Sequence, residues 1–415
     1  MSTERGDDST TATGGPRRRR WALLIGVPVA AAAVAGFAVG MGKQGTDPTA
    51  NAVATGADTQ AESSASPSPS GSAPSTPKSP VTMSATGDIL IGSVPNMMPA
   101  NDGQGFFDDV TGALASDLQM GNLEQALTDE TDSSKCGPAG NGNECYQFRL
   151  PPQYATLLSQ AGFKVINQAN NHAYDFGPQG YANTKATLQA NGITQLGDPG
   201  TYAVLDVKGT KVAVIGFSSY DTNNNVNNIP ADVELVKKAQ KEADIVVVQA
   251  HMGAEGSDQT HTPYGSEIFY DENRGDVRAF SHAMIDAGAD VVIGHSPHVL
   301  RGMEFYNGHL IAYSLGNFTG GGGTLSSAGA LGLGGILKVT LNPDGTWAGG
   351  QFVSTQMDGA GRPTLDSGQN SLALLRDVSV DYPGTAAVFG DDGTISAPTA
   401  TPADAASATV TPAAG

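Results

Sequence analysis

Side chains that can bind metal ions follow several β-like segments in the middle of this chain. Apolar runs such as Ile245–Val248 and Val291–Ile293 are followed closely by histidine, carboxylate or amide groups. Because α/β folds place ligand sites where strand ends face a loop crevice, we expect these groups to meet in one site. They lie in five short strings: Gly87-Asp88, Asn122-Leu123-Glu124, Ala169-Asn170-Asn171-His172, His251-Met252-Gly253-Ala254-Glu255 and Gly294-His295-Ser296-Pro297-His298.

The types of side chain in these strings limit the class of metal that such a site could bind, without identifying the metal. Imidazole, carboxylate and amide groups together suit a borderline-to-hard divalent ion such as Zn, Mn or Fe. A thiolate site is excluded because no cysteine lies in any of the strings. The sequence therefore predicts a divalent metal as cofactor.

Each string also has a purely structural interpretation. His251 is expected to bind the metal while Glu255 orients it or binds substrate, but a lone histidine after a strand is often a buried structural residue. Asn171 and His172 are either a ligand and a substrate-facing imidazole or parts of a hydrogen-bonded turn. His295 and His298 have the most favourable ligand spacing, whereas Asp88 and Glu124 are also compatible with turn or capping carboxylates.

The charge of the chain excludes one class of partner. The 415 residues include 41 acidic and 22 basic side chains, which give a formal net charge of −19. Four of the basic residues are consecutive, Arg17-Arg18-Arg19-Arg20, so the rest of the chain is still more acidic. Such a surface repels nucleic acid and other anionic polymers at long range, although a bound cation can reverse the sign of the charge locally. Nucleic acid is not an expected partner.

The N-terminal part of the chain predicts export. After the arginines, Trp21–Met41 is uncharged and long enough for a bilayer core of about 30 Å. We expect residues 1–20 in the cytoplasm, a single transmembrane helix at 21–42 and an extracellular folded domain. The alternative is a signal peptide cleaved near Ala33-Val34-Ala35, which would give a secreted protein.

The remaining composition predicts one folded domain between two disordered segments. Residues 43–80 form a Ser/Pro/Ala-rich linker and residues 390–415 an Ala/Thr/Pro-rich tail, and neither can bury a core. Between them, residues 81–389 alternate β-like runs with helix-length amphipathic segments. This alternation predicts a layered α/β domain.

The two cysteines of the chain bracket a glycine-rich loop. Cys136 and Cys145 are separated by eight residues of which three are glycine and two are asparagine. In an exported protein such a pair favours a structural disulfide over a metal or redox role.

Taken together, the strings resemble the bacterial capsule synthesis family typified by CapA, over about residues 81–320. The resemblance implies an αββα sandwich of the calcineurin-like metallophosphoesterase type. The motifs that carry it are Thr86-Gly87-Asp88-Ile89-Leu90, Gly121-Asn122-Leu123-Glu124, Ala169-Asn170-Asn171-His172, Asp244 to Glu255, Gly288 to His298 and Tyr313 to Phe318.

The resemblance also implies roles for individual residues and a centre with one or two metal ions. Asp88 and His298 would serve one metal, and Asn171, His251 and His295 a second, with Glu124 and Asn122 near or between them. His172 would protonate a leaving oxygen, oriented by Asp175, while Glu255 and Asn317 would contact substrate. Two positions depart from the phosphoesterase pattern, because Leu90 and Asn122 stand where a histidine and an aspartate are usual.

Two functions follow from the resemblance. The first is a metal-dependent hydrolase that acts in making or exporting capsular poly-γ-glutamate or a related anionic surface polymer. The second is a non-catalytic subunit that binds or scaffolds this polymer. In both cases the expected partners are the polymer, membrane-bound synthase subunits and, through the N-terminal helix, the membrane.

Overall fold

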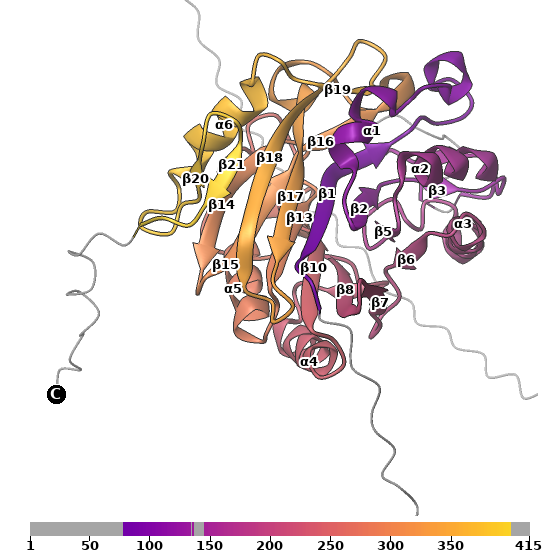
Figure 1. The fold of residues 1–415 in the computed structure, drawn as a ribbon. Helices are drawn as coiled ribbons and strands as arrows, with labels where there is room; N and C mark the ends of the chain where they lie inside the picture. The colour runs from indigo at the N-terminus through magenta and orange to yellow at the C-terminus, as the bar shows by residue number, and fades with distance from the viewer. Residues whose placement is uncertain (1–77, 134, 137–144, 400–415) are drawn as a thin grey trace, which may run out of the picture. The chain divides into compact units, whose positions relative to one another are not determined.

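Two β-sheets packed face to face form the centre of the protein (Figure 1). The computed structural model describes residues 78–133, 135–136 and 145–399. The first sheet has the strand order β20-β21-β18-β17-β1-β2-β5-β6, with β16 beside β1 and β19 beside β18. Its strands are β1 (Val81–Leu90), β2 (Leu118–Leu123), β5 (Val165–Asn167), β6 (Thr194–Leu196), β16 (Asn317–Gly320), β17 (Leu333–Leu341), β18 (Trp347–Met357), β19 (Pro363–Leu365), β20 (Val388–Phe389) and β21 (Thr394–Ser396).

The second sheet has the order β14-β15-β13-β10-β8-β7, with β9 beside β8. Its central strands β8, β10, β13 and β15 run parallel, so their carboxyl ends meet at one edge. The strands are β7 (Ala203–Val207), β8 (Thr210–Ser218), β9 (Asn224–Asn225), β10 (Ile245–His251), β13 (Val291–His295), β14 (Leu300–Tyr306) and β15 (His309–Leu315). Two small ladders pair β3 (Ala126–Leu127) with β4 (Arg149–Leu150) and β11 (Ile268–Phe269) with β12 (Glu272–Asn273).

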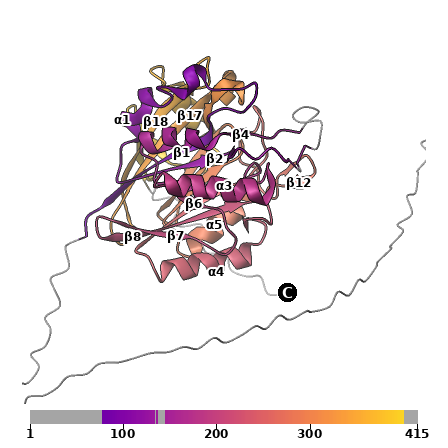
Figure 2. The ribbon, with the colours of Figure 1, turned by 90° about the vertical axis from the view of Figure 1, so that its right-hand side faces the viewer.

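Helices cover the outer face of each sheet. α1 (Asp108–Leu114), α2 (Ala155–Ala161) and α3 (Gly177–Ala190) pack on the first sheet, and α4 (Ile229–Gln240) and α5 (Val277–Asp286) on the second. α1 and α4 accordingly lie on opposite sides of the two sheets (Figures 1 and 2). α6 (Asn370–Ser379) packs along β14 and β18. The predicted layered α/β domain is confirmed as a four-layer αββα sandwich.

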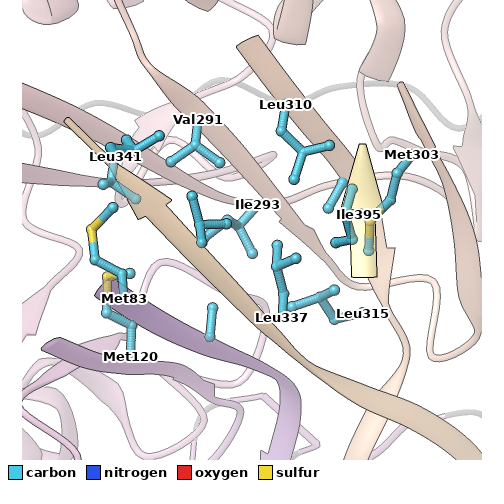
Figure 3. Close-up of a cluster of buried hydrophobic side chains, with 14 of the residues drawn as sticks. Met83, Met120, Val291, Ile293, Met303, Leu310, Leu315, Leu337, Leu341 and Ile395 are labelled. Carbon is cyan, nitrogen blue, oxygen red and sulfur yellow. The ribbon is translucent and has the colours of Figure 1, made fainter. Parts of the chain in front are cut away.

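Alternating side chains of the buried strands build these layers. In β10, Ile245 and Val247 enter the core between the sheets, whereas Val246 and Val248 pack against α4 and α5. This pattern follows from the two-residue period of a strand that is buried on both faces. Figure 3 shows the inner core, in which Met83 and Met120 of the first sheet face Val291 and Ile293 of the second.

Local signals in the sequence place several helix ends. Pro178 and Pro230 lie in the first turns of α3 and α4, where a proline loses no helical hydrogen bond. The Asp276 carboxylate caps α5 by accepting a 3.0 Å hydrogen bond from the Ala279 amide. Gly162 ends α2 with φ +99°, a left-handed conformation that favours glycine.

Two predictions about the chain ends need correction. No helix in the described ranges could span a membrane; the longest, α3 with 14 residues, is about 21 Å long, less than the bilayer core. The predicted single-pass membrane location is therefore not supported, and segment 21–42 lies outside the described residues. The predicted tail also starts too early, because Thr394–Ser396 forms β21 and pairs with β18 and β20.

Asp232, in the first turn of α4, makes stability depend on pH. Its side chain is 3 % exposed, and burial raises its pKa to about 7. The folded state therefore binds more protons than the unfolded state between about pH 4 and 7, so stability falls as the pH rises through this range. Asp232→Asn is expected to raise the free energy of unfolding at pH 8 by about 1–2 kcal/mol. This value is reduced for solvent screening because Asp232 lines an open surface cavity.

Thermal unfolding at two pH values tests this prediction. The melting temperature of Asp232→Asn should exceed that of the wild type by about 2–5 °C at pH 8 and by less at pH 5. Asp377→Asn, which changes an exposed acid in α6, is the matched control. An equal gain at both pH values would contradict the assignment.

Candidate metal centre

The candidate metal centre lies where strands of both sheets end. Asp88 is near the end of β1, Glu124 directly follows β2, and His251 and His295 are the last residues of β10 and β13. The sheet register places His251 beside His295. His298 lies in the short connection between β13 and β14. Five predicted residues from four of the five strings are thus gathered at one place.

Asp88, Glu124 and His298 form the core of this centre. Each is buried, and one ligand atom from each lies within 4.8 Å of those of the other two. His298 Nε2 is 3.6 Å from Glu124 Oε1, and His298 Nδ1 is 3.3 Å from Asp88 Oδ2. His251 Nε2 is also 3.6 Å from Glu124 Oε1, and His295 Nδ1 is 3.6 Å from Asp88 Oδ1.

The three 3.6 Å spacings fit shared coordination better than hydrogen bonding. An N–H···O bond spans about 2.7–3.2 Å, whereas two atoms that ligate one ion at about 2.0–2.2 Å lie about 3–3.6 Å apart. Several of the atoms are also buried without a hydrogen-bond partner: Glu124 Oε1 and Oε2, Asn171 Oδ1, His251 Nε2, and His295 Nδ1 and Nε2. Buried polar atoms are normally paired, so this convergent set fits a divalent cation.

The charges at the centre also call for a cation. Burial raises the pKa of the Glu124 carboxyl well above its usual range, and the neighbouring charges of Asp88 and Glu255 add to this. Burial acts against a charged His298, yet the charges of Glu124, Glu255 and Asp88 outweigh it and raise the pKa of that imidazole. Burial also opposes ionisation of Asp88, but hydrogen bonding and charge from His298 hold its pKa low.

The two other imidazoles are held uncharged. Burial lowers the pKa of His251 well below its usual range and that of His295 to about 4. Neutral imidazole is the form that binds a metal ion. Both residues are therefore in the ligating form at neutral pH.

The backbone around His298 is held in an unusual conformation. Ser296 and His298 have φ values of +99° and +61°, a region that side chains other than glycine rarely adopt. Such residues cost of the order of 1–3 kcal/mol each and cluster at functional sites. The Ser296 hydroxyl donates a 3.0 Å hydrogen bond to the Gly253 carbonyl, which joins this turn to the loop after β10.

Asn317 fixes the orientation of the His298 ring. His298 Nδ1 lies 2.8 Å from Asn317 Oδ1, while Asn317 Nδ2 donates to the Leu331 carbonyl at 3.0 Å. Because Nδ1 faces acceptors, it carries the proton, and Nε2 is left to face Glu124. Asn317, which we expected to contact substrate, is 1 % exposed and lies behind His298.

Asn122 has a similar supporting position. Its Nδ2 donates to Asp88 Oδ1 at 2.8 Å, and its Oδ1 accepts hydrogen bonds from Asn167 and Asn170 at 3.0 and 3.1 Å. The amide oxygen is therefore already satisfied. We expected Asn122 to be a metal ligand. In this arrangement it instead orients Asp88 and offers no free ligand atom.

His172 and Asp175 meet at the edge of the centre. His172 Nδ1 lies 2.7 Å from Asp175 Oδ2, which also accepts the Phe148 amide at 2.7 Å. A carboxylate at Nδ1 fixes the tautomer with a free Nε2. Burial lowers the pKa of His172, against the opposing charge of Asp175, so the ring is neutral at pH 7.

A cavity of about 270 Å³ adjoins the centre. Asn171, His172 and Glu255 belong both to the predicted strings and to its lining. Its other walls come from the segment around the disulfide, from the loop between β8 and β9, and from the β11–β12 hairpin with the residue after it. These residues are Lys135, Cys145, Tyr146, Tyr220, Phe269, Tyr270, Glu272 and Arg274. A substrate in this cavity would lie against His172 and beside the metal ligands.

Sequence reasoning did not identify Lys135, Tyr220 or Arg274. Lys135 Nζ donates to Asp175 Oδ1 at 2.8 Å and to the Asn171 carbonyl at 3.0 Å. Its position directly before Cys136, which is disulfide-bonded to Cys145, was the one available signal. Tyr220 and Arg274 belong to no recognisable motif, because they reach the site through loop structure.

A buried ion pair supports the loop that carries Glu255. Arg301 donates to both carboxylate oxygens of Glu267 at 2.7 Å and to the Gln259 carbonyl at 2.8 Å. The side chains of Arg301 and Glu267 are 0 % and 3 % exposed. Arg301→Met should destabilise the protein by about 3–5 kcal/mol, because it leaves the Glu267 charge buried and unpaired.

Urea unfolding measures this cost. Arg362→Met, which breaks an ion pair with Asp358 on the surface, is the matched control and should cost less than about 1 kcal/mol. If both variants lost the same free energy of unfolding, burial would not determine how much the Arg301–Glu267 ion pair contributes to stability.

The comparison with protein families identifies this arrangement. Residues 82–321, more than half of the chain, match the model described as "Bacterial capsule synthesis protein PGA_cap". The chain belongs to this PGA_cap family. The matched range of this PGA_cap chain contains every residue of the metal centre described above, and the resemblance predicted from the motifs is confirmed.

Named relatives agree with the family. The chain is 32 % identical over 260 residues to the PGA biosynthesis protein CapA of Bacillus subtilis. The aligned region covers 57 % of this chain and 63 % of that protein. The chain is 30 % identical over 262 residues to a probable polyglutamine synthesis accessory protein of Mycobacterium tuberculosis, covering 59 % and 65 % of the two chains. This PGA_cap chain thus spans less than two thirds of the length of these relatives.

Solved structures give weaker matches. A 5′-nucleotidase precursor from Thermus thermophilus aligns with a TM-score of 0.39 and 13 % identity, covering 72 % of this chain and 59 % of that one. A putative 5′-nucleotidase from Staphylococcus aureus aligns with a TM-score of 0.37 and 11 % identity, covering 73 % and 58 %. Similarity at this level supports no statement about function, and the calcineurin-like type of the PGA_cap sandwich stays a prediction.

Proposed function

We propose that this protein acts in the synthesis or export of capsular poly-γ-glutamate or a related anionic polymer, through a metal-dependent hydrolase-type site. The observation that carries the proposal is the set of buried, unpartnered ligand atoms around Glu124 and His298. Membership of the capsule synthesis family supports the choice of polymer. Subunits of a polymer synthase are the expected partners.

The residues of the centre would hold one or two divalent ions, Mn, Zn or Fe. Asp88, Glu124 and His298 form the core of the ligand set, and Asn171, His251 and His295 supply the further atoms. A divalent ion there would polarise a phosphoester, ester or amide oxygen of the substrate. Asn122 and Asn317 keep Asp88 and His298 in position.

His172 would move the proton during bond cleavage. Its Nδ1 is held by Asp175, and its ring lines the cavity next to the metal ligands. Because the ring is neutral at pH 7, it would first accept at Nε2 a proton from the attacking water and then donate that proton to the leaving oxygen or nitrogen. Lys135 restrains Asp175 from the other side.

Hydrolysis assays test the proposal. Purified protein loaded with Mn²⁺ should cleave poly-γ-glutamate or a simple phosphoester, measured as new amino groups or released phosphate, and a chelator should abolish the activity. If no substrate is cleaved, and if a His172→Ala strain makes normal capsule, the hydrolase assignment fails. The non-catalytic polymer-binding role would then account for the site, in line with Leu90 at the position of an expected ligand.

A further inference from the structure

Glu255 joins the metal centre to the substrate cavity. Its Oε2 lies 3.6 Å from His298 Nε2, the same distance that separates this nitrogen from Glu124 Oε1. Its other oxygen, Oε1, accepts hydrogen bonds from Arg274 Nη1 at 2.8 Å and from Asn171 Nδ2 at 3.4 Å. One oxygen of Glu255 is therefore fixed, and the other faces the centre.

Arg274 is itself tightly held. The side chain is only 4 % exposed, and its guanidinium lies 5.6 Å from the Tyr220 ring centre and 5.2 Å from that of Phe269. Its Nη2 is 3.1 Å from Glu272 Oε2, which also accepts the Tyr220 hydroxyl at 2.6 Å. Two neighbouring aromatic rings and two carboxylates thus hold the guanidinium in a defined direction.

The backbone links the same two segments. The Arg274 carbonyl accepts a 2.8 Å hydrogen bond from the Gly253 amide, two residues before Glu255. Arg274 is thus connected to the loop after β10 through both main chain and side chain. Arg274 is buried beside both Glu255 and Glu272, and the cost of burying its charge is repaid only where the ion pairs and hydrogen bonds have good geometry.

We propose that Arg274 is a positioning residue of the metal centre. It holds Glu255 so that Oε2 joins Glu124 and His298 in the ligand set, on the side that opens to the cavity. This inference rests on the proposed metal-dependent function. It changes the expected role of Glu255 from substrate contact to metal ligand, and it makes the β11–β12 hairpin part of the centre.

The affinity for Mn²⁺, titrated with full-length purified protein and followed by electron paramagnetic resonance, tests the inference without an activity assay. Arg274→Lys keeps the charge but loses the planar guanidinium that contacts both Glu255 and Glu272. It should weaken Mn²⁺ binding by about 10-fold, the smaller of the losses usual when a residue that supports a metal ligand is changed. Arg362→Lys, a surface ion-pair variant, is the matched control and should bind as the wild type does.

A double-mutant cycle shows whether Arg274 acts through Glu255. Glu255→Gln should also weaken binding, and adding Arg274→Lys to it should cause little further loss. Full additivity of the two losses would overturn the inference, as would wild-type affinity in folded Arg274→Lys protein.

A milder variant covers the case in which Arg274→Lys does not fold. Tyr220→Phe combined with Glu272→Gln loosens the guanidinium but leaves Arg274 and Glu255 intact, and it should weaken Mn²⁺ binding by about 3-fold, a fraction of the direct effect. Unchanged affinity in this variant would overturn the inference. If wild-type protein binds none of Mn²⁺, Zn²⁺ and Fe²⁺, the proposed metal-dependent function itself fails, which separates the two outcomes.

Discussion

Replacing His298 with alanine is expected to weaken divalent-metal binding by roughly 100-fold or more. This loss is larger than the usual loss when a residue that only supports a metal ligand is changed. His298 Nε2 lies 3.6 Å from both Glu124 Oε1 and Glu255 Oε2, so its removal takes away the atom around which the carboxylates gather. The variant also leaves Asp88 and Glu124 buried without their closest cationic partner, so bound metal should contribute less to thermal stability.

The measurement is a calorimetric titration with Mn²⁺ and Zn²⁺, backed by melting curves with and without metal. His309→Ala is the matched control, since this histidine lies on β15 beside the Asp290 carbonyl, outside the centre. It should bind metal as the wild type does. If His298→Ala retained wild-type affinity, the ligand set proposed above would be wrong.

Replacing His172 with alanine should lower turnover by about 10²–10⁴-fold, the usual contribution of a positioned acid–base group. The His172 ring contacts Asp175 and lines the cavity, so metal affinity should change little. Steady-state rates on the most active substrate, together with Mn²⁺ titration of the same samples, separate proton transfer from metal binding. Asp175→Asn should give a smaller loss, because it removes the orienting charge but keeps the imidazole.

Two other results for the His172 variant would contradict its role in proton transfer. A variant that loses metal but retains its turnover per bound ion would place His172 among the ligands. A variant with unchanged turnover would remove acid–base chemistry from this residue and leave the hydrolase proposal without a proton donor.

The sequence predicted the layers of the fold because its central strands carry strong signals. Ile245–Val248 and Val291–Ile293 are continuous apolar runs, as strands buried on both faces require. Pro178 and Asp276 likewise lie at the starts of α3 and α5, as is common for a proline in the first turn and for an aspartate that caps a helix. Signals of this kind are local, so they can be read without knowing the tertiary structure.

β2 and β21 show where local signals were insufficient. Leu118–Leu123 contains glycine and asparagine, which are poor strand formers, and becomes a strand because it lies between β1 and β5. Thr394–Ser396 was read as part of a low-complexity tail, yet it pairs with Gly350 and Gln351 of β18. Both strands depend on partners distant in the sequence.

In the candidate site, too, some residues could be identified from local sequence signals and others could not. Histidines and carboxylates at strand ends, such as His251 and Asp88, were identifiable because topology brings strand ends together. The supporting residues were not: Asn317 acts behind His298, and Arg274 reaches Glu255 from a hairpin. Their roles depend on side-chain directions that no spacing in the sequence encodes.

Anomalous diffraction from crystals grown with Mn²⁺ tests the central claim most directly. A peak is expected within coordination distance, about 2.0–2.3 Å, of Glu124 and His298, with Asp88 or Glu255 completing the contacts. A well-ordered centre without such a peak, or Mn²⁺ bound only at surface carboxylates, would contradict a metal-dependent function for this protein.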